Sequence, residues 1–251
     1  MGNNPDFEEE PTETSWETTK VDGSNMRMYL SIPEGPGPFP AVLVSQHGPG
    51  VNEFIQDIVD NLAKEGYVGC APELYHRVTK EMLADGSSAG QHLSDPQIVN
   101  DIDATVEFLR NHRSVDGERL GVTGFCQGGR TTWLAAATNS HFKAAAPFFG
   151  GNIMVPVGDA DQSPFDRTDG IKCPVLFHFG GLDTNPSPED QGKYDAELTR
   201  LGITHEFYSY PGADHAFMDY NRERYQKEAS DVAWPRTLQF FSAHLKKVAT
   251  R

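Results

Sequence analysis

The stretch GVTGFCQGGR, residues 121–130, decides the fold, because it has the pattern of a β-strand that turns sharply into a helix. A residue at the tip of such a turn is forced out of the sheet toward solvent. Small neighbours are needed there, because the strand and helix backbones nearly touch. Gly124, Gly128 and Gly129 supply these small neighbours around Cys126. The pattern therefore predicts that Cys126 is a reactive thiol rather than a packed one.

Strand and helix patterns alternate on both sides of this turn, which predicts a mostly parallel central sheet with helices on both faces. The irregular segment 72–94 is expected to cover a site. We predict strands near 16–21, 26–32, 41–45, 67–71, 119–124, 143–149, 174–179 and 204–210. Helices are predicted over 53–66, from 95, after 126, over 187–201 and over 226–248. Pro235 should kink or restart the last of these helices.

The length and composition of the chain indicate one large domain. We expect the acidic segment 1–15 to be flexible and residues 16–251 to form a single α/β domain. The formal net charge of −15 argues against nucleic acid and anionic membranes as partners. We expect a monomer or a small homo-oligomer.

The three cysteines are an odd number at wide spacing, which favours neither a disulfide framework nor a zinc site. Cys70 and Cys173 lie in or beside apolar strands and are expected to pack in the core. The N-terminal residues lack the basic and apolar regions of a signal peptide, and no apolar run approaches 18 residues. We therefore expect a cytoplasmic protein without metal or cofactor.

Three chemically active residues follow separate predicted strands. Cys126, Asp183 and His215 occur in the chain order nucleophile, acid, histidine, and functional residues of open parallel sheets lie at these strand ends. His215 can accept the thiol proton, and Asp183 can fix the His215 tautomer. Asp214 is a rival orienting acid, disfavoured because neighbouring residues rarely present their side chains toward one another.

An oxyanion hole is expected beside the thiol. The helix that begins near Gln127 directs its free N–H groups and its dipole at Cys126, which favours a thiolate and an adjacent oxyanion. The backbone N–H of Gln127, together with one from the loop 47–48, would hold the oxyanion.

Several motifs together resemble the dienelactone hydrolase (carboxymethylenebutenolidase) family of the α/β-hydrolase superfamily. The resemblance implies a Cys126–Asp183–His215 triad, an acyl-thioester intermediate and a small ester or enol-lactone substrate. It also makes Gly48 the second oxyanion donor. The matching segments are GVNEF (50–54), LAKEGYVGCAPELYHR (62–77), GFCQGGR (124–130), FFGGN (148–152), FGGLDTNPSPED (179–190), YPGADHAF (210–217), NRERY (221–225) and AWPRTLQFFSAHL (233–245).

The chain departs from the family pattern at two positions. His47 stands where many members have a glutamate that holds the resting thiol. Of the two arginines that bind the dienelactone carboxylate, one matches Arg77, whereas Asp219 replaces the other. Arg222 is a possible compensating cation. The remaining substrate-binding candidates are His47, Tyr75 and Phe217.

These departures leave alternatives open. The first is a hydrolase of the same fold with a shifted substrate: a neutral ester, a thioester or a phosphoester. The second is a non-catalytic protein that uses Cys126 as an oxidisable, redox-sensing thiol.

Overall fold

The computed structural model describes residues 12–246, which form one eight-stranded sheet in the order β1-β2-β4-β3-β5-β6-β7-β8. The first two strands pair antiparallel, β2 also pairs antiparallel with β4, and every later pairing is parallel, as predicted. The strands are β1 (Glu13–Val21), β2 (Ser24–Ile32), β3 (Phe39–Ser45), β4 (Val68–Pro72), β5 (Val115–Phe125), β6 (Phe142–Phe148), β7 (Val175–Gly180) and β8 (His205–Tyr210).

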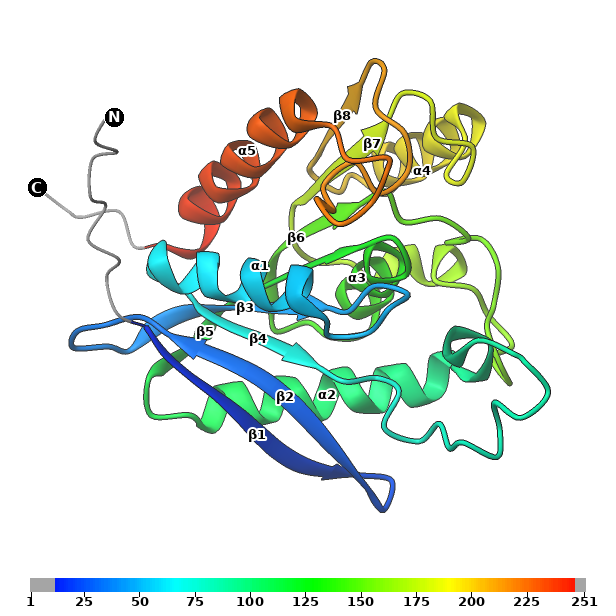
Figure 1. Ribbon diagram of the computed structural model, residues 1–251. Coiled ribbons are helices and arrows are strands. Elements are labelled where there is room, and N and C mark those ends of the chain that lie inside the picture. The colour runs from blue at the N-terminus through cyan, green and yellow to red at the C-terminus, as the bar shows by residue number, and fades with distance from the viewer. Residues whose placement is uncertain (1–11, 247–251) are drawn as a thin grey trace, which may run out of the picture.

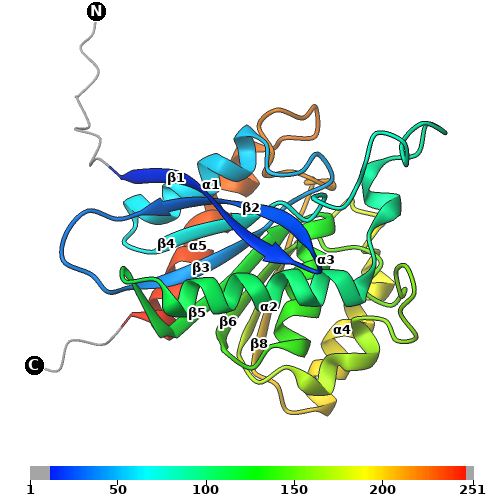
Figure 2. The same ribbon diagram turned by 90° about the horizontal axis from the view of Figure 1, so that it is seen from below.

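Helices cover both faces of this sheet, which confirms the predicted architecture (Figures 1 and 2). One face carries α1 (Glu53–Lys64) and α5 (Lys227–Leu245), and the other carries α2 (Asp95–Asn111) and α3 (Gln127–Thr138). The core residues of α4 (Pro188–Arg200) belong to the same layer as those of α2 and α3. Two short 3₁₀ helices, η1 (Ala89–His92) and η2 (Phe165–Gly170), lie in the connections.

The alternation of side chains along each central strand divides the core into two layers. In β3, Ala41 and Leu43 pack with α2 and α3, whereas Val42 and Val44 pack with α1 and α5. All four are completely buried, as a strand covered on both faces requires. The continuous apolar run at residues 41–45 thus corresponds to a strand whose two faces are both covered by helices.

Some element boundaries and the course of α5 differ from the sequence prediction; β5, for example, begins at Val115 rather than near 119. Strand β1 begins at Glu13, earlier than expected, because its pairing with β2 extends to Ile32. Helix α5 passes through Pro235 without restarting, and its buried residues Ala233, Thr237 and Phe241 continue on both sides of the proline. Packing against the sheet outweighs the one hydrogen bond that proline removes. The division of the chain at residue 15 stays a prediction, and residues 1–11 lie outside the described part.

The long connection between β4 and α2 contains only η1 as regular structure. Its residues Ser88, Gly90, Gln91 and Leu93 line a pocket that Cys126 also lines, so this segment covers the site as predicted. Within residues 12–246, no helix has the length and apolar character needed to cross a membrane.

Candidate active site

Cys126 occupies the tip of the turn between β5 and α3. Its backbone has φ 58° and ψ −117°, a left-handed conformation that is costly for a residue with a side chain. The surrounding structure holds this conformation: the Cys126 N–H donates to Phe148 O at 3.1 Å, and Cys126 O accepts from Arg130 N at 3.2 Å. The thiol is thereby presented at the carboxyl end of the sheet.

The glycines of the turn are required by close backbone contacts. A Cβ on Gly124 would lie 2.4 Å from Gly128 O, and one on Gly128 would lie 2.3 Å from Ser45 O. At Gly129 the added carbon would lie 2.3 Å from Phe148 O. Helix α3 thus begins in contact with the ends of β3 and β6, as the sequence predicts.

Two residues from the neighbouring strand ends lie beside the thiol. His215 lines the same two pockets as Cys126, and its Nδ1 lies 2.8 Å from Asp183 Oδ2. Asp183 is buried, and its other oxygen accepts the Asn185 N–H at 2.8 Å, so the carboxylate is fixed at both oxygens. Asp214 instead accepts the backbone N–H of His215 at 2.6 Å and does not reach the ring.

This arrangement changes the pKa values of the thiol and the imidazole in opposite directions. Burial acts to raise the pKa of Cys126, but the hydrogen bond and charge of His215, with the Gln127 N–H, lower it below that of a free thiol. Burial acts to lower the pKa of His215, but its hydrogen bonds with Asp183 and Cys126 raise it above that of a free imidazole. The pair therefore favours thiolate and imidazolium at neutral pH.

Alkylation of Cys126 by iodoacetamide is expected to reach its maximal rate at a lower pH than a free thiol allows. The rate should rise with pH through the Cys126 pKa, with a midpoint below about 8.5, the value of an unperturbed cysteine. The pH–rate profile of the protein, with a Cys126→Ala blank, measures this midpoint. Cys70 and Cys173 should contribute little, because burial raises the pKa of each. A midpoint at or above the free value would contradict the expectation and indicate a thiol held in reserve.

Both predicted oxyanion donors lie near the thiol. Gln127 follows Cys126 as the first residue of α3, and its N–H acts to lower the pKa of the thiol. Gly48 lines a pocket together with Cys126 and His215. Tyr75 lies between the two segments, with its hydroxyl 2.9 Å from Gly48 O and 3.0 Å from Gln127 Oε1.

Two pockets meet at Cys126 and His215. The first, which we call the apolar pocket, has a volume of about 290 Å³. The second, which we call the charged pocket, has a volume of about 580 Å³. The apolar pocket is lined by Ser88, Gly90, Gln91, Leu93, Ile98, Cys126, Gln127, Arg130, Thr131, Gly151, Asn152, Val157, Asn185 and His215. The charged pocket is lined by His47, Gly48, Pro49, Cys126, His215, Ala216, Asp219, Asn221, Arg222, Glu223 and Arg224.

The apolar pocket contains a buried arginine that the sequence analysis did not single out. Arg130 makes two hydrogen bonds to Asp95, at 2.6 and 2.8 Å, and both side chains are buried. Its guanidinium also donates to the Asn152 and Val155 carbonyls, at 3.1 and 2.6 Å. The positive charge is therefore neutralised, and the contacts fix the loop that forms one wall of the pocket. In the sequence, Asp95 and Pro96 indicate only the start of the helix predicted from residue 95.

His47 and Asp219 form one buried group in the charged pocket. The His47 Nε2 lies 2.7 Å from Asn52 Oδ1, and its Nδ1 lies 3.7 Å from Asp219 Oδ2. Both ring nitrogens thus face partners other than the thiol. Burial lowers the pKa of His47, although Asn52 and Asp219 act against this effect. A neutral His47 packed beside the turn is consistent with this geometry. Arg222 Nε lies 3.4 Å from Asp219 Oδ2 and offsets the acidic charge, whereas its role in binding substrate stays a prediction.

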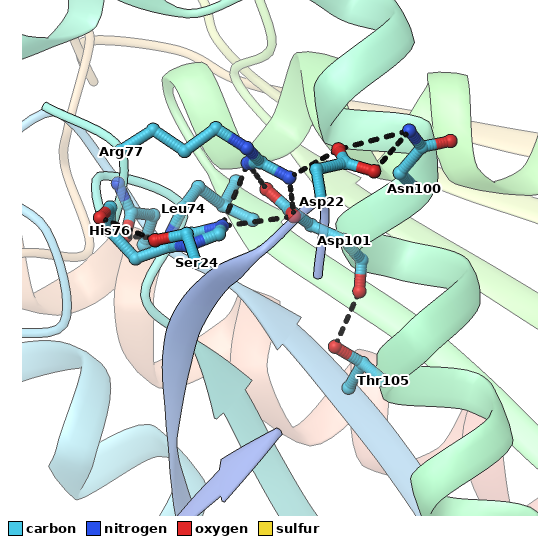
Figure 3. Close-up of polar contacts among 9 residues, drawn as sticks. Asp22, Ser24, Leu74, His76, Arg77, Asn100, Asp101 and Thr105 are labelled. Atoms are coloured by element: carbon cyan, nitrogen blue, oxygen red, sulfur yellow. Dashed lines mark hydrogen bonds and ion pairs between the residues drawn. The ribbon is translucent and has the colours of Figure 1, made fainter. Parts of the chain in front are cut away.

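The structure places Arg77 outside both pockets. Its guanidinium lies 2.8 and 2.7 Å from the two oxygens of Asp101 in α2 and 2.8 Å from Asp22 in the β1–β2 turn (Figure 3). His76 completes the group, with Nε2 3.0 Å from Asp101 Oδ1. A guanidinium paired with two carboxylates is poorly suited to bind a substrate carboxylate, so the geometry does not support the role that the family resemblance implies.

Phe217 also lies away from the pockets. It is completely buried and contacts Phe149 and Tyr210 at ring-centroid distances of 5.3 Å. Its position two residues after His215 reflects packing rather than substrate contact. Cys70 and Cys173 are buried as predicted. Among residues 12–246, no cluster of three or more His, Cys, Asp or Glu side chains could hold a metal ion.

The mostly parallel sheet, the sharp strand–helix turn and the residues at its strand ends define an α/β-hydrolase. The family model described as "Dienelactone hydrolase family" matches residues 26–245. The chain therefore belongs to the dienelactone hydrolase family, and the prediction of an ester or lactone hydrolase is confirmed at the level of the family.

Similar proteins agree with this assignment. A "Putative carboxymethylenebutenolidase" from Synechocystis sp. is 34% identical and matches 87% of this chain and 92% of that protein. A "Probable 2-oxo-3-(5-oxofuran-2-ylidene)propanoate lactonase" from Bradyrhizobium sp. is 32% identical, over 92% of this chain and 94% of its own. A solved structure titled "Putative Dienelactone Hydrolase" from Klebsiella pneumoniae is 32% identical, with a TM-score of 0.84, and covers 93% of this chain and 100% of its own.

Proposed function

We propose that this protein hydrolyses a small ester or lactone through a thioester formed on Cys126. One observation carries the proposal: Cys126 and His215 both line the two pockets where these meet, and the His215 Nδ1 lies 2.8 Å from Asp183 Oδ2. A nucleophile, a base and an orienting acid in this sequence support acyl transfer.

Acylation follows from the positions of these groups. With the thiol proton on His215, the Cys126 sulfur forms a bond to the substrate carbonyl carbon, and the C=O π electrons move to oxygen. The Gln127 and Gly48 N–H groups stabilise this oxyanion in the proposed mechanism. The oxyanion then re-forms C=O, the carbonyl carbon–oxygen single bond breaks, and His215 gives its proton to the leaving oxygen.

Deacylation reverses these roles with water. His215 accepts a proton from a water molecule, whose oxygen bonds to the thioester carbon. The C=O π electrons move to oxygen as this bond forms and return as the carbon–sulfur bond breaks. The carboxylic acid is released, and the Cys126 thiolate and the His215 imidazolium are restored. Asp183 stabilises the imidazolium in both halves of the cycle.

A neutral substrate is favoured over an anionic dienelactone. Of the described residues that line the apolar pocket, only Arg130 carries a permanent positive charge, and Asp95 neutralises it. Arg77 is paired with Asp101 and Asp22, and Asp219 adds a carboxylate to the charged pocket. Arg222 and Arg224 of the charged pocket lie 3.4 and 3.5 Å from Asp219 and Asp214, so their charges are also offset. An anionic acyl group would therefore meet little net positive charge, whereas Leu93, Ile98 and Val157 suit an apolar one.

A library of neutral and anionic esters and lactones tests both parts of the proposal. We expect rapid quenching to trap a protein whose mass has increased by one acyl group, located on the Cys126 peptide, and neutral members to turn over faster than dienelactone. Mass spectrometry and hydrolysis rates supply the two readouts. Turnover without any adduct on Cys126 would contradict the thioester, and a clear preference for dienelactone would contradict the neutral substrate.

A further inference from the structure

We propose that Tyr75 is a positioning residue of the oxyanion hole: its hydroxyl holds the Gly48 turn against the start of α3. This inference rests on the proposed ester hydrolysis and adds a residue that acts through the backbone donors rather than on the substrate.

The hydroxyl of Tyr75 connects two segments that are distant in the sequence. It lies 2.9 Å from Gly48 O and 3.0 Å from the Gln127 side chain, while Gln127 is the first residue of α3. Gly48 is exposed and belongs to a tight turn closed by the Gly50 N–H donating to His47 O at 2.9 Å. The exposed part of this turn, Gly48-Pro49, depends on outside contacts to keep one position, and Tyr75 provides such a contact.

Counting protons gives the direction of this hydrogen-bond chain. A phenol has one proton, so Tyr75 cannot donate fully to both oxygens. The Gln127 Nε2 is buried and otherwise has no partner. With the Gln127 amide turned by 180°, Nε2 donates to the Tyr75 oxygen and Tyr75 donates to Gly48 O. Each of the two hydrogen bonds then has a proton of its own, while Gln127 Oε1 takes the position that Nε2 leaves. Burial raises the pKa of Tyr75, so its hydroxyl keeps the proton that it must donate.

The surroundings of Tyr75 hold this chain in place. A Cβ on Gly90 of η1 would lie 3.1 Å from Gln127 Oε1 and 3.5 Å from the Tyr75 hydroxyl, so the Gly90 backbone packs directly over both groups. Before Tyr75, the Leu74 N–H donates to the buried Gln46 Oε1 at 2.9 Å. A backbone covered and anchored in this way leaves the ring little freedom.

The residues after Tyr75 are anchored by the ion pairs of Figure 3. Ser24 donates its hydroxyl to His76 O at 3.0 Å, and Arg77 is held by Asp101 and Asp22. The arginine of this segment thus fixes the loop rather than binding substrate. Oxyanion stabilisation depends on donors that are fixed before the reaction, so a fixed Tyr75 contributes to catalysis through Gly48.

Tyr75→Phe separates this role from a general effect on the fold or the thiol. We expect kcat for p-nitrophenyl acetate to fall about tenfold, less than loss of an oxyanion donor itself, with KM changed by less than about twofold. The rate of Cys126 alkylation by iodoacetamide should stay within about twofold, because displacement of iodide from a saturated carbon creates no oxyanion. Steady-state kinetics and timed alkylation followed by mass spectrometry provide the measurements.

Two further variants make the result decisive. Tyr29→Phe removes a hydroxyl that bonds Asp60 outside the site, and should keep wild-type kcat. Gln127→Leu removes the other end of the hydrogen-bond chain. The double variant with Tyr75→Phe should be no less active than the less active of the two single variants. Wild-type kcat in Tyr75→Phe, or an equal loss of hydrolysis and alkylation, would overturn the inference. Failure of the proposed function would give a different result from failure of this inference, because hydrolysis would then be retained in Cys126→Ala.

Discussion

Replacing Cys126 by alanine is expected to reduce turnover of p-nitrophenyl acetate by about 10⁴-fold or more, because removal of a nucleophile eliminates the covalent pathway altogether. Only the slow reaction of water in the same pocket should remain. Alanine keeps the Cβ and makes no new contact at the left-handed turn, so the fold should be retained. Steady-state hydrolysis and thermal unfolding, compared with the wild-type protein, measure both quantities.

Cys173→Ala is the matched control for this experiment. It removes the same sulfur from a buried position outside both pockets and should leave kcat within about twofold, although some stability is lost with the sulfur. Substantial hydrolysis by Cys126→Ala would refute the thioester pathway. A wild-type protein that hydrolyses no ester, yet undergoes peroxide-reversible modification on Cys126, would instead support the redox-sensing alternative.

The parts of the structure that depend on local sequence could be predicted. Close contacts at Gly124, Gly128 and Gly129 leave no room for a side chain, so three glycines around one cysteine indicate the turn by themselves. Alternating apolar and mixed segments similarly indicate the parallel sheet. Because parallel strands end at one edge of a sheet, the positions of Cys126, Asp183 and His215 after three strands were sufficient to predict that they lie near one another.

The contacts that depend on distant partners could not be predicted. Nothing around Arg77 indicates that Asp22 and Asp101, 55 and 24 residues away, would bind its guanidinium. The role of Asp95 as the partner of Arg130 is equally invisible, because the sequence shows only a good helix start. The role of a charged residue is ambiguous in the sequence, because an arginine can bind a ligand or pair with a carboxylate of the same protein. The fold decides which partner lies near it.

Asp183→Asn is expected to lower kcat for the same ester by about 10³-fold, less than the loss of the thiol itself. The carboxylate both orients the His215 ring and raises its pKa, and an amide does neither reliably. If the Asn amide donates to Nδ1, the ring carries its proton on the nitrogen facing Cys126 and can no longer accept one. The alkylation midpoint of Cys126 should also move to higher pH, because a lower pKa of His215 leaves less imidazolium to stabilise the thiolate. This effect is larger than the opposite effect of removing the Asp183 charge.

Asp214→Asn separates this role from a general loss of charge in the same loop. It removes a carboxylate that contacts the His215 backbone N–H and Arg224, but not the ring, so kcat should change by less than about threefold. Equal losses in the two variants would show that the charge near His215 matters and its geometry does not. A large loss in Asp214→Asn alone would transfer the orienting role to Asp214. Since the buried Asp183 is fixed by Asn185 as well as by His215, we expect the larger loss of kcat in Asp183→Asn.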